Sequence, residues 1–171
     1  MSPDLILLAI EDITARKQAE RLQQESQDRL RTIVNTAVDA IITADERGTI
    51  ASVNPAAERM FGYPAAEMLG QNVTMLMPTP HREEHDGYLE RYLRPGEKHV
   101  IGIGREVRGR RKDGSTFPMD LSISEYHDRT RRFFSGVLRD LSDRRALERE
   151  VLEALTMEQW RTGQELHDST A

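Results

Sequence analysis

Cysteine is absent from the 171 residues of this chain. Its absence excludes disulfide frameworks, zinc knuckles, iron–sulfur clusters and every thiol-dependent mechanism, including the thiol-dependent photochemistry of flavin proteins. No apolar run approaches the roughly 18 residues that a membrane span needs. Near the start, the apolar stretch from Leu5 to Ile10 is too short and too poorly flanked for a signal peptide. We therefore expect a cytoplasmic protein, with no membrane contact in this part of it.

An excess of positive charge is also missing. Lysine and arginine number 24 against 29 acidic residues, so the formal charge is 24 − 29 = −5. Such a chain has no basic field for a nucleic acid or an anionic membrane surface. With 37% apolar and 31% charged residues, the composition favours one small core with solvated helices attached to it.

The first half of the chain alternates between helix and strand signals. Residues 15–37 predict one helix with an apolar stripe as narrow as a coiled-coil seam. The stripe consists of Ala15, Ala19, Leu22, Ser26, Leu30, Ile33 and Ala37. Residues 40–44 and 49–53 predict a β-hairpin around a polar turn, and Asn54-Pro55 predicts the start of a short helix that ends at Gly62.

The second half predicts another helix, three strands and a final helix. A helix is expected over residues 81–93, and strands over 99–107, 115–125 and 132–138. The chain is expected to be helical again from Ser142 to its end. The predicted fold class is α+β: a five-stranded antiparallel sheet with helices on one face, flanked by coiled-coil signalling helices.

A short internal sequence repeat indicates the expected domain boundaries. Residues 8–17 resemble residues 136–145, each an apolar run that ends in Asp, an aliphatic residue and a hydroxyl residue before a basic helix, with an offset of 140 − 12 = 128 residues. Residues 1–14 are therefore predicted to be the last strand of an upstream domain of the same kind. Residues 15–37 would be a linker helix, 30–141 a sensor domain, and 142–171 a signalling helix.

Several motifs in this order resemble PAS domains, of the haem-binding oxygen-sensor (FixL-like) type. The motifs are Gly70-Gln71-Asn72-Val73, Leu76-Met77-Pro78, residues 85–92, 101–105 and 111–119, and the Asp140-Leu141-Ser142 exit. The resemblance implies the PAS fold, haem b as cofactor and a diatomic gas such as oxygen as ligand. It also implies that His85 is the axial ligand of the iron.

The residues themselves leave the role of His85 open. His85, Tyr88, Leu89 and Tyr92 have the spacing of one helix face, so the imidazole shares its face with core residues. A histidine aimed at a cavity can ligate haem iron, but it can also be a core histidine satisfied by one hydrogen bond. The resemblance favours ligation, and it adds Tyr88 to the cofactor site.

Strand alternation places His99, Ile101, Ile103 and Arg105 on one inward face. A cation among isoleucines needs an anionic partner, because burying an unpaired guanidinium is costly. The resemblance implies that Arg91 and His99 contact the haem propionates and that Arg105 moves between a propionate and the gas. Alternatively, Arg105 reaches the sheet edge and pairs with Glu106 or Asp120. Leu121 and Ile123, on the next strand, would crowd the other side of the haem.

The C-terminal residues Glu165-Leu166-His167-Asp168 resemble the phosphoacceptor box of two-component histidine kinases. The resemblance implies that His167 is phosphorylated and that Asp168 is its acid–base neighbour. No ATP-binding sequence follows, so this fragment is not expected to be catalytic alone. ATP would bind only in a missing kinase domain, and the partners would be a second copy of the chain, held through coiled-coil helices, and a response regulator. The alternative is a cofactor-free PAS module for dimerisation and signal relay.

Overall fold

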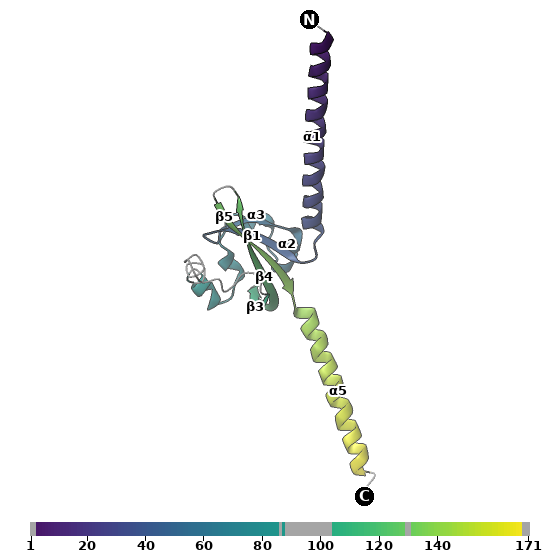
Figure 1. Ribbon diagram of the computed structural model, residues 1–171. Helices are drawn as coiled ribbons and strands as arrows, with labels where there is room; N and C mark the ends of the chain where they lie inside the picture. Colours follow the sequence, from purple (N-terminus) through teal and green to yellow (C-terminus); the bar gives the residue numbers. More distant parts are fainter. Residues whose placement is uncertain (1–2, 86, 88–103, 129–130, 169–171) are drawn as a thin grey trace.

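The computed structural model describes residues 3–85, 87, 104–128 and 131–168. Five strands form one antiparallel sheet in the order β2-β1-β5-β4-β3 (Figure 1). The strands are β1 (Ala40–Asp45), β2 (Ile50–Val53), β3 (Arg105–Arg110), β4 (Thr116–Asp128) and β5 (Arg131–Asp140). The α+β class and the five-stranded antiparallel sheet predicted from the sequence are confirmed.

Short helical elements follow β2. They are α2 (Pro55–Phe61), α3 (Ala65–Met68) and the 3₁₀ turn η1 (Val73–Leu76). The start of α2 is fixed by Asn54, whose side chain accepts a hydrogen bond from the amide of Ala57, and its end by Gly62 in the left-handed conformation (φ 75°). Both boundaries are the ones that the Asn-Pro and Gly signals predict.

The core lies between the sheet and these helical elements. Phe61 of α2 is fully buried and packs edge-to-face on Phe117 of β4, with ring centroids 5.6 Å apart. Alternate residues of β1, Ala40, Ile42 and Ala44, face the same core. The period of two along β1 therefore separates a buried inner face from an outer face that bears half-buried residues.

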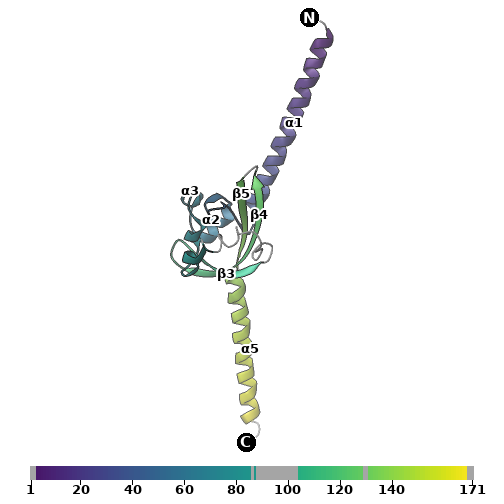
Figure 2. The ribbon, with the colours of Figure 1, turned by 60° about the vertical axis from the view of Figure 1, so that its left-hand side comes forward.

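Two long helices leave the domain in opposite directions (Figures 1 and 2). Helix α1 spans Pro3–Thr36 and α5 spans Ser142–Asp168. Both expose large apolar side chains to solvent. These are Ile13, Leu22, Leu30, Ile33 and Val34 on α1, and Leu147, Val151, Leu152, Leu155 and Met157 on α5. No helix in the described part of the chain combines the length and the apolar character that a membrane crossing requires.

The structure corrects the prediction of a strand within residues 1–14. From Pro3 onward this segment is the first part of α1, continuous with the predicted linker helix, which ends at Thr36 instead of Ala37. An isolated strand has no neighbour for its backbone hydrogen bonds, whereas a helix satisfies them internally. Whether this segment follows an upstream domain stays a prediction.

The other expected elements form with shifted ends. Residues 81–85 and 87 are helical, and the rest of the predicted helix 81–93 lies outside the described residues. The described part of the predicted strand 99–107 begins at Arg105 and continues to Arg110. Strands β4 and β5 are each longer than predicted, because their pairing extends into the polar turn between them.

Candidate functional site

The inner face of β3, β4 and β5 carries the described part of the predicted ligand site. Arg105 pairs with Leu121, and Leu121 pairs with the buried Leu138, so all three residues face the core side of the sheet. In the neighbouring row, Ile123 is opposite Gly136. Leu121 and Ile123 are only half-buried. Next to the buried Phe117 and Met119, this part of the inner face is therefore apolar and, among the described residues, incompletely covered.

Gly136 lies near the centre of this face. A Cβ built on it would meet the Cδ1 atoms of Leu121 at 3.6 Å and of Leu138 at 3.7 Å, which are ordinary van der Waals distances. Glycine thus leaves room between two leucines where other strand residues would place a side chain. A flat apolar group fits such a face.

Arg105 is on the predicted face, but it is exposed. The alternative partner Glu106 forms its ion pair with Arg145 of α5. Arg105 makes no ion pair with another described residue. The expected inward register of Arg105 is therefore observed without the expected burial.

His85 is one of the helical residues 81–85 and 87. Its side chain is half-buried, and its Nδ1 atom is enclosed by protein. By contrast, His81, at the start of the same segment, is exposed. Five other predicted site residues lie outside the described residues, namely Tyr88, Arg91, His99, Ile101 and Ile103. The structure therefore brings Arg105, Leu121 and Ile123 together on one face, and the remaining members stay predictions.

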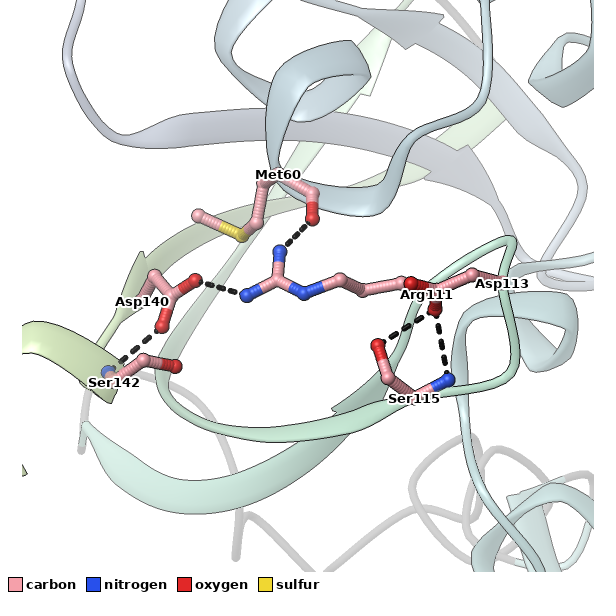
Figure 3. A network of polar contacts seen from close by, with 6 residues as sticks. All are labelled: Met60, Arg111, Asp113, Ser115, Asp140 and Ser142. Atoms are coloured by element: carbon pink, nitrogen blue, oxygen red, sulfur yellow. Dashed lines mark hydrogen bonds and ion pairs between the residues drawn. The ribbon is translucent and has the colours of Figure 1, made fainter.

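A second constellation lies where β5 passes into α5 (Figure 3). The Arg111 guanidinium donates to Asp140 Oδ2 at 2.6 Å and to the carbonyl of Met60 at the end of α2. It also lies over the Phe117 ring, 3.8 Å from the centroid. The other carboxylate oxygen, Oδ1, accepts the amide N–H of Ser142 at 2.8 Å. One arginine thus ties α2, the core and the start of α5 together.

The charge state of Asp140 follows from these contacts. Partial burial on its own would raise the pKa of Asp140, but hydrogen bonds from Ser142 and Arg111 outweigh it and the pKa lies below its ordinary value. The carboxylate is therefore ionised at neutral pH. An ionised side chain that accepts a first-turn N–H also favours the N-terminal end of α5.

Sequence reasoning singled out Asp140 and Ser142 as parts of the exit motif, but it gave no role to Arg111. Arg111 precedes a polar turn between β3 and β4, in which Asp113 accepts hydrogen bonds from the amide and hydroxyl of Ser115, and these bonds lower the pKa of Asp113. No local pattern distinguishes Arg111 from its neighbour Lys112, which pairs with Glu67. Arg111 and Asp140 are 29 positions apart in the sequence, so only the folded structure identifies Arg111 as the partner of Asp140.

His167 and Asp168 are in the last turn of α5. The helix that begins at the Asp140 junction therefore continues to the predicted phosphoacceptor. The environment of the two side chains lies outside the described residues. A continuous helix is a rigid element of about 1.5 Å rise per residue, so a rotation at Ser142 reaches its far end.

Comparisons with known proteins agree with this architecture. Residues 28–141 match the family described as "PAS fold". The chain is 46% identical over 132 residues to the sensor protein FixL of Bradyrhizobium diazoefficiens, an overlap of 77% of this chain and 26% of that protein. It is 32% identical over 127 residues to the cell-division control histidine kinase PdhS of Brucella ovis, an overlap of 74% of this chain and 12% of the kinase.

A solved structure gives the same fold. The PAS domain of an HTR-like protein from Haloarcula marismortui superposes with a TM-score of 0.60 at 24% identity, covering 72% of this chain and 98% of that one. The chain spans about a quarter or less of the length of FixL and PdhS. The family match covers most of the chain and coincides with the observed sheet and core, and so the chain belongs to the PAS family.

Proposed function

We propose that this chain is part of the sensory input region of a sensor histidine kinase, and that its PAS domain binds haem b and senses oxygen or another diatomic gas. The observation that carries the proposal is a half-buried histidine, with an enclosed Nδ1 atom, in a domain 46% identical to the matching region of FixL. The part of the site that the structure describes fits a flat apolar cofactor, since Leu121 and Ile123 line an incompletely covered face around Gly136.

Each residue has a distinct part in this proposal. Haem b, when bound, supplies an iron centre that takes up the gas. His85 would hold the iron. Arg91 and His99 would receive the propionates, and Arg105 would be a mobile donor on the inner face. Apolar contacts come from Leu121 and Ile123 and, outside the described residues, from Tyr88, Ile101 and Ile103.

Absorption of the purified chain, after addition of haemin and removal of unbound haemin by gel filtration, tests the cofactor. We expect a Soret band for the wild type and for His81→Ala, which removes an exposed histidine of the same helical segment. We expect His85→Ala to lose the band while its circular dichroism stays that of the wild type. An unchanged band in His85→Ala refutes the ligand assignment. No band in the wild type favours the alternative, a cofactor-free relay module.

The proposal extends to the partners. The exposed apolar stripes of α1 and α5 are suited to a parallel, cytoplasmic homodimer in which paired helices carry the signal. His167 would then be the phosphoacceptor, with Asp168 as its neighbour and a response regulator as the recipient of the phosphoryl group. ATP would bind to a kinase domain outside this sequence.

Phosphorylation in trans tests this second part. The chain is mixed with the ATP-binding domain of a histidine kinase of the FixL type and radiolabelled ATP. We expect label on the wild type and on His81→Gln, and none on His167→Gln. Equal labelling of all three chains contradicts the assignment of His167.

A further inference from the structure

The end of α1 is held by one buried side chain. Asn54 is 1% exposed, and its Nδ2 donates to the carbonyl of Val34 in the last turns of α1 at 3.1 Å and to the carbonyl of Asp39 at 3.0 Å. Its Oδ1 accepts from the amides of Ile41 and Ala57. A single amide thus uses both its donors and its acceptor to join α1, the segment before β1, β1 itself and α2.

The segment before β1 also contacts the C-terminal end of β5, through Asp39. The Asp39 carboxylate accepts two hydrogen bonds from the Arg139 guanidinium, at 2.9 Å from Nε and 2.7 Å from Nη2. These residues are 100 positions apart in the sequence. The pair extends the β1–β5 ladder, in which Ala40 is opposite Leu138. The hydrogen bonds lower the pKa of Asp39 and raise that of Arg139, so both groups are charged at neutral pH.

Arg139 lies three residues before Ser142, where α5 begins. The residue after Arg139 is Asp140, whose carboxylate accepts the Ser142 amide. Polar contacts therefore run from Val34 of α1 through Asn54 and Asp39 to Arg139, and the backbone from Arg139 to Asp140 completes the path to the first turn of α5. This path uses no residue of the inner face that was assigned to the cofactor.

We propose that Asn54, Asp39 and Arg139 form a polar bridge that fixes the incoming helix α1 relative to the outgoing helix α5, so that a displacement of α1 is transmitted to α5 directly. The domain then relays input from a partner or domain on the N-terminal side as well as a signal from its own cavity. This relay goes beyond the proposed function because it needs no bound cofactor.

The Asp39–Arg139 pair is expected to affect the relative orientation of α1 and α5 more than the stability of the fold. Arg139 is well exposed, with 67% of its side chain accessible against 26% for Asp39. Exposed pairs contribute little free energy, but a bidentate arginine–carboxylate pair restricts the relative orientation of the two backbones that carry it. Loss of the pair is therefore expected to widen the range of angles between α1 and α5 and to leave the fold intact.

Distance measurements between spin labels test the bridge. Because the chain lacks cysteine, Arg31→Cys and Glu153→Cys give one label on each helix, both at exposed positions. The doubly labelled chain is diluted with unlabelled chain, so that distances within one molecule dominate, and no haemin is added. The variants are Asp39→Asn, Arg139→Gln and the two combined. Glu67→Gln, which breaks the exposed pair with Lys112, is the matched control.

We expect a sharp distance distribution for the wild type and for Glu67→Gln. Asp39→Asn and Arg139→Gln should each broaden the distribution, and the double variant should broaden it no further, because both substitutions remove the same contact. Unchanged widths in the single variants overturn the proposal. So do additive broadening in the double variant or equal broadening in Glu67→Gln. Circular dichroism of each variant excludes unfolding as the cause of a broader distribution.

Discussion

The two halves of the sheet use the same face in different ways. On the β1–β2 side, α2 covers the inner face, and Ala40, Ile42 and Ile50 are between 0% and 5% exposed. On the β3–β4 side, Phe117 and Met119 belong to the same core, but farther along that face Leu121 and Ile123 are half-buried and Arg105 is exposed. The finished half is therefore the core that includes Phe117 and Met119 and holds the domain together. The open half, around Leu121 and Ile123, retains apolar surface that a ligand can cover.

The largest effect is expected in the finished half. Phe61→Ala removes a fully buried ring that packs on Phe117. Large-to-small substitutions of this kind cost about 3–5 kcal/mol. Ile123→Ala, in the half-buried face, should cost only about 1–2 kcal/mol, because part of its side chain is already in water. Urea denaturation without haemin measures both values, and equal losses would mean that the two halves are packed alike.

The difference between the halves also explains what sequence could predict. The finished half is built from local signals: period-two alternation in β1, the Asn54 cap and Gly62, and each of these gave nearly the right boundary. The order β2-β1-β5-β4-β3 was not predicted, since no local pattern places β5 beside β1.

The candidate site was harder to predict from the sequence than the core. Alternation placed Arg105 on the right face, but exposure depends on what lies above that face, and sequence gave no measure of it. Arg111 was missed because it is one of several basic residues in a polar run, and Arg139 because a single arginine at the end of a strand carries no signal of its partner. Their partners, Asp140 and Asp39, are 29 and 100 residues away. Ion pairs at such separations are selected by tertiary structure.

Filling the open half should exclude the proposed haem. Gly136→Phe places a ring on the inner face between Leu121 and Leu138, whereas Gly136→Ala adds only a methyl group at an ordinary contact distance. We expect the affinity for haemin to fall by about tenfold or more in Gly136→Phe, equivalent to about 1.4 kcal/mol, and to change little in Gly136→Ala. Haemin titration followed by absorption measures both affinities. Equal affinity in Gly136→Phe and the wild type would place the cofactor elsewhere.

The helices extend the comparison, because their apolar stripes resemble the open half in lacking cover. Leu30 on α1 is 62% exposed, so a partner helix would bury most of it. Leu30→Ser should weaken a dimer by about 1–2 kcal/mol for each side chain removed from the interface. Arg29→Ser, at the adjacent exposed position, should have no such effect. Sedimentation equilibrium measures the dissociation constants, and a monomeric wild type at tens of micromolar would contradict the dimer.

The smallest effect is expected at the junction that links the finished half to α5. Asp140→Asn removes the charge that faces Arg111, in a pair whose side chains are 27% and 30% exposed. Because the pair is only partly buried, the cost at neutral pH should be about 1 kcal/mol rather than the larger penalty of a fully buried pair. Glu67→Gln, in a pair that is 47% and 49% exposed, should cost less than about 0.5 kcal/mol.

The pH dependence of the free energy of unfolding distinguishes the contribution of the Asp140 charge from that of the side chain's shape. Its pKa in the folded chain lies below the ordinary value of 3.8, so the unfolded chain takes up the proton first as pH falls. The stabilisation is therefore complete above about pH 5, where both states are ionised, and is lost as pH falls through the folded pKa. Asp39 has a lowered pKa as well, but it is present in both chains and cancels in their difference. Urea denaturation from pH 7 to pH 3 should show the gap between wild type and Asp140→Asn closing toward acid. A constant gap would mean that Asp140 acts through shape and hydrogen bonding to Ser142 instead of through charge.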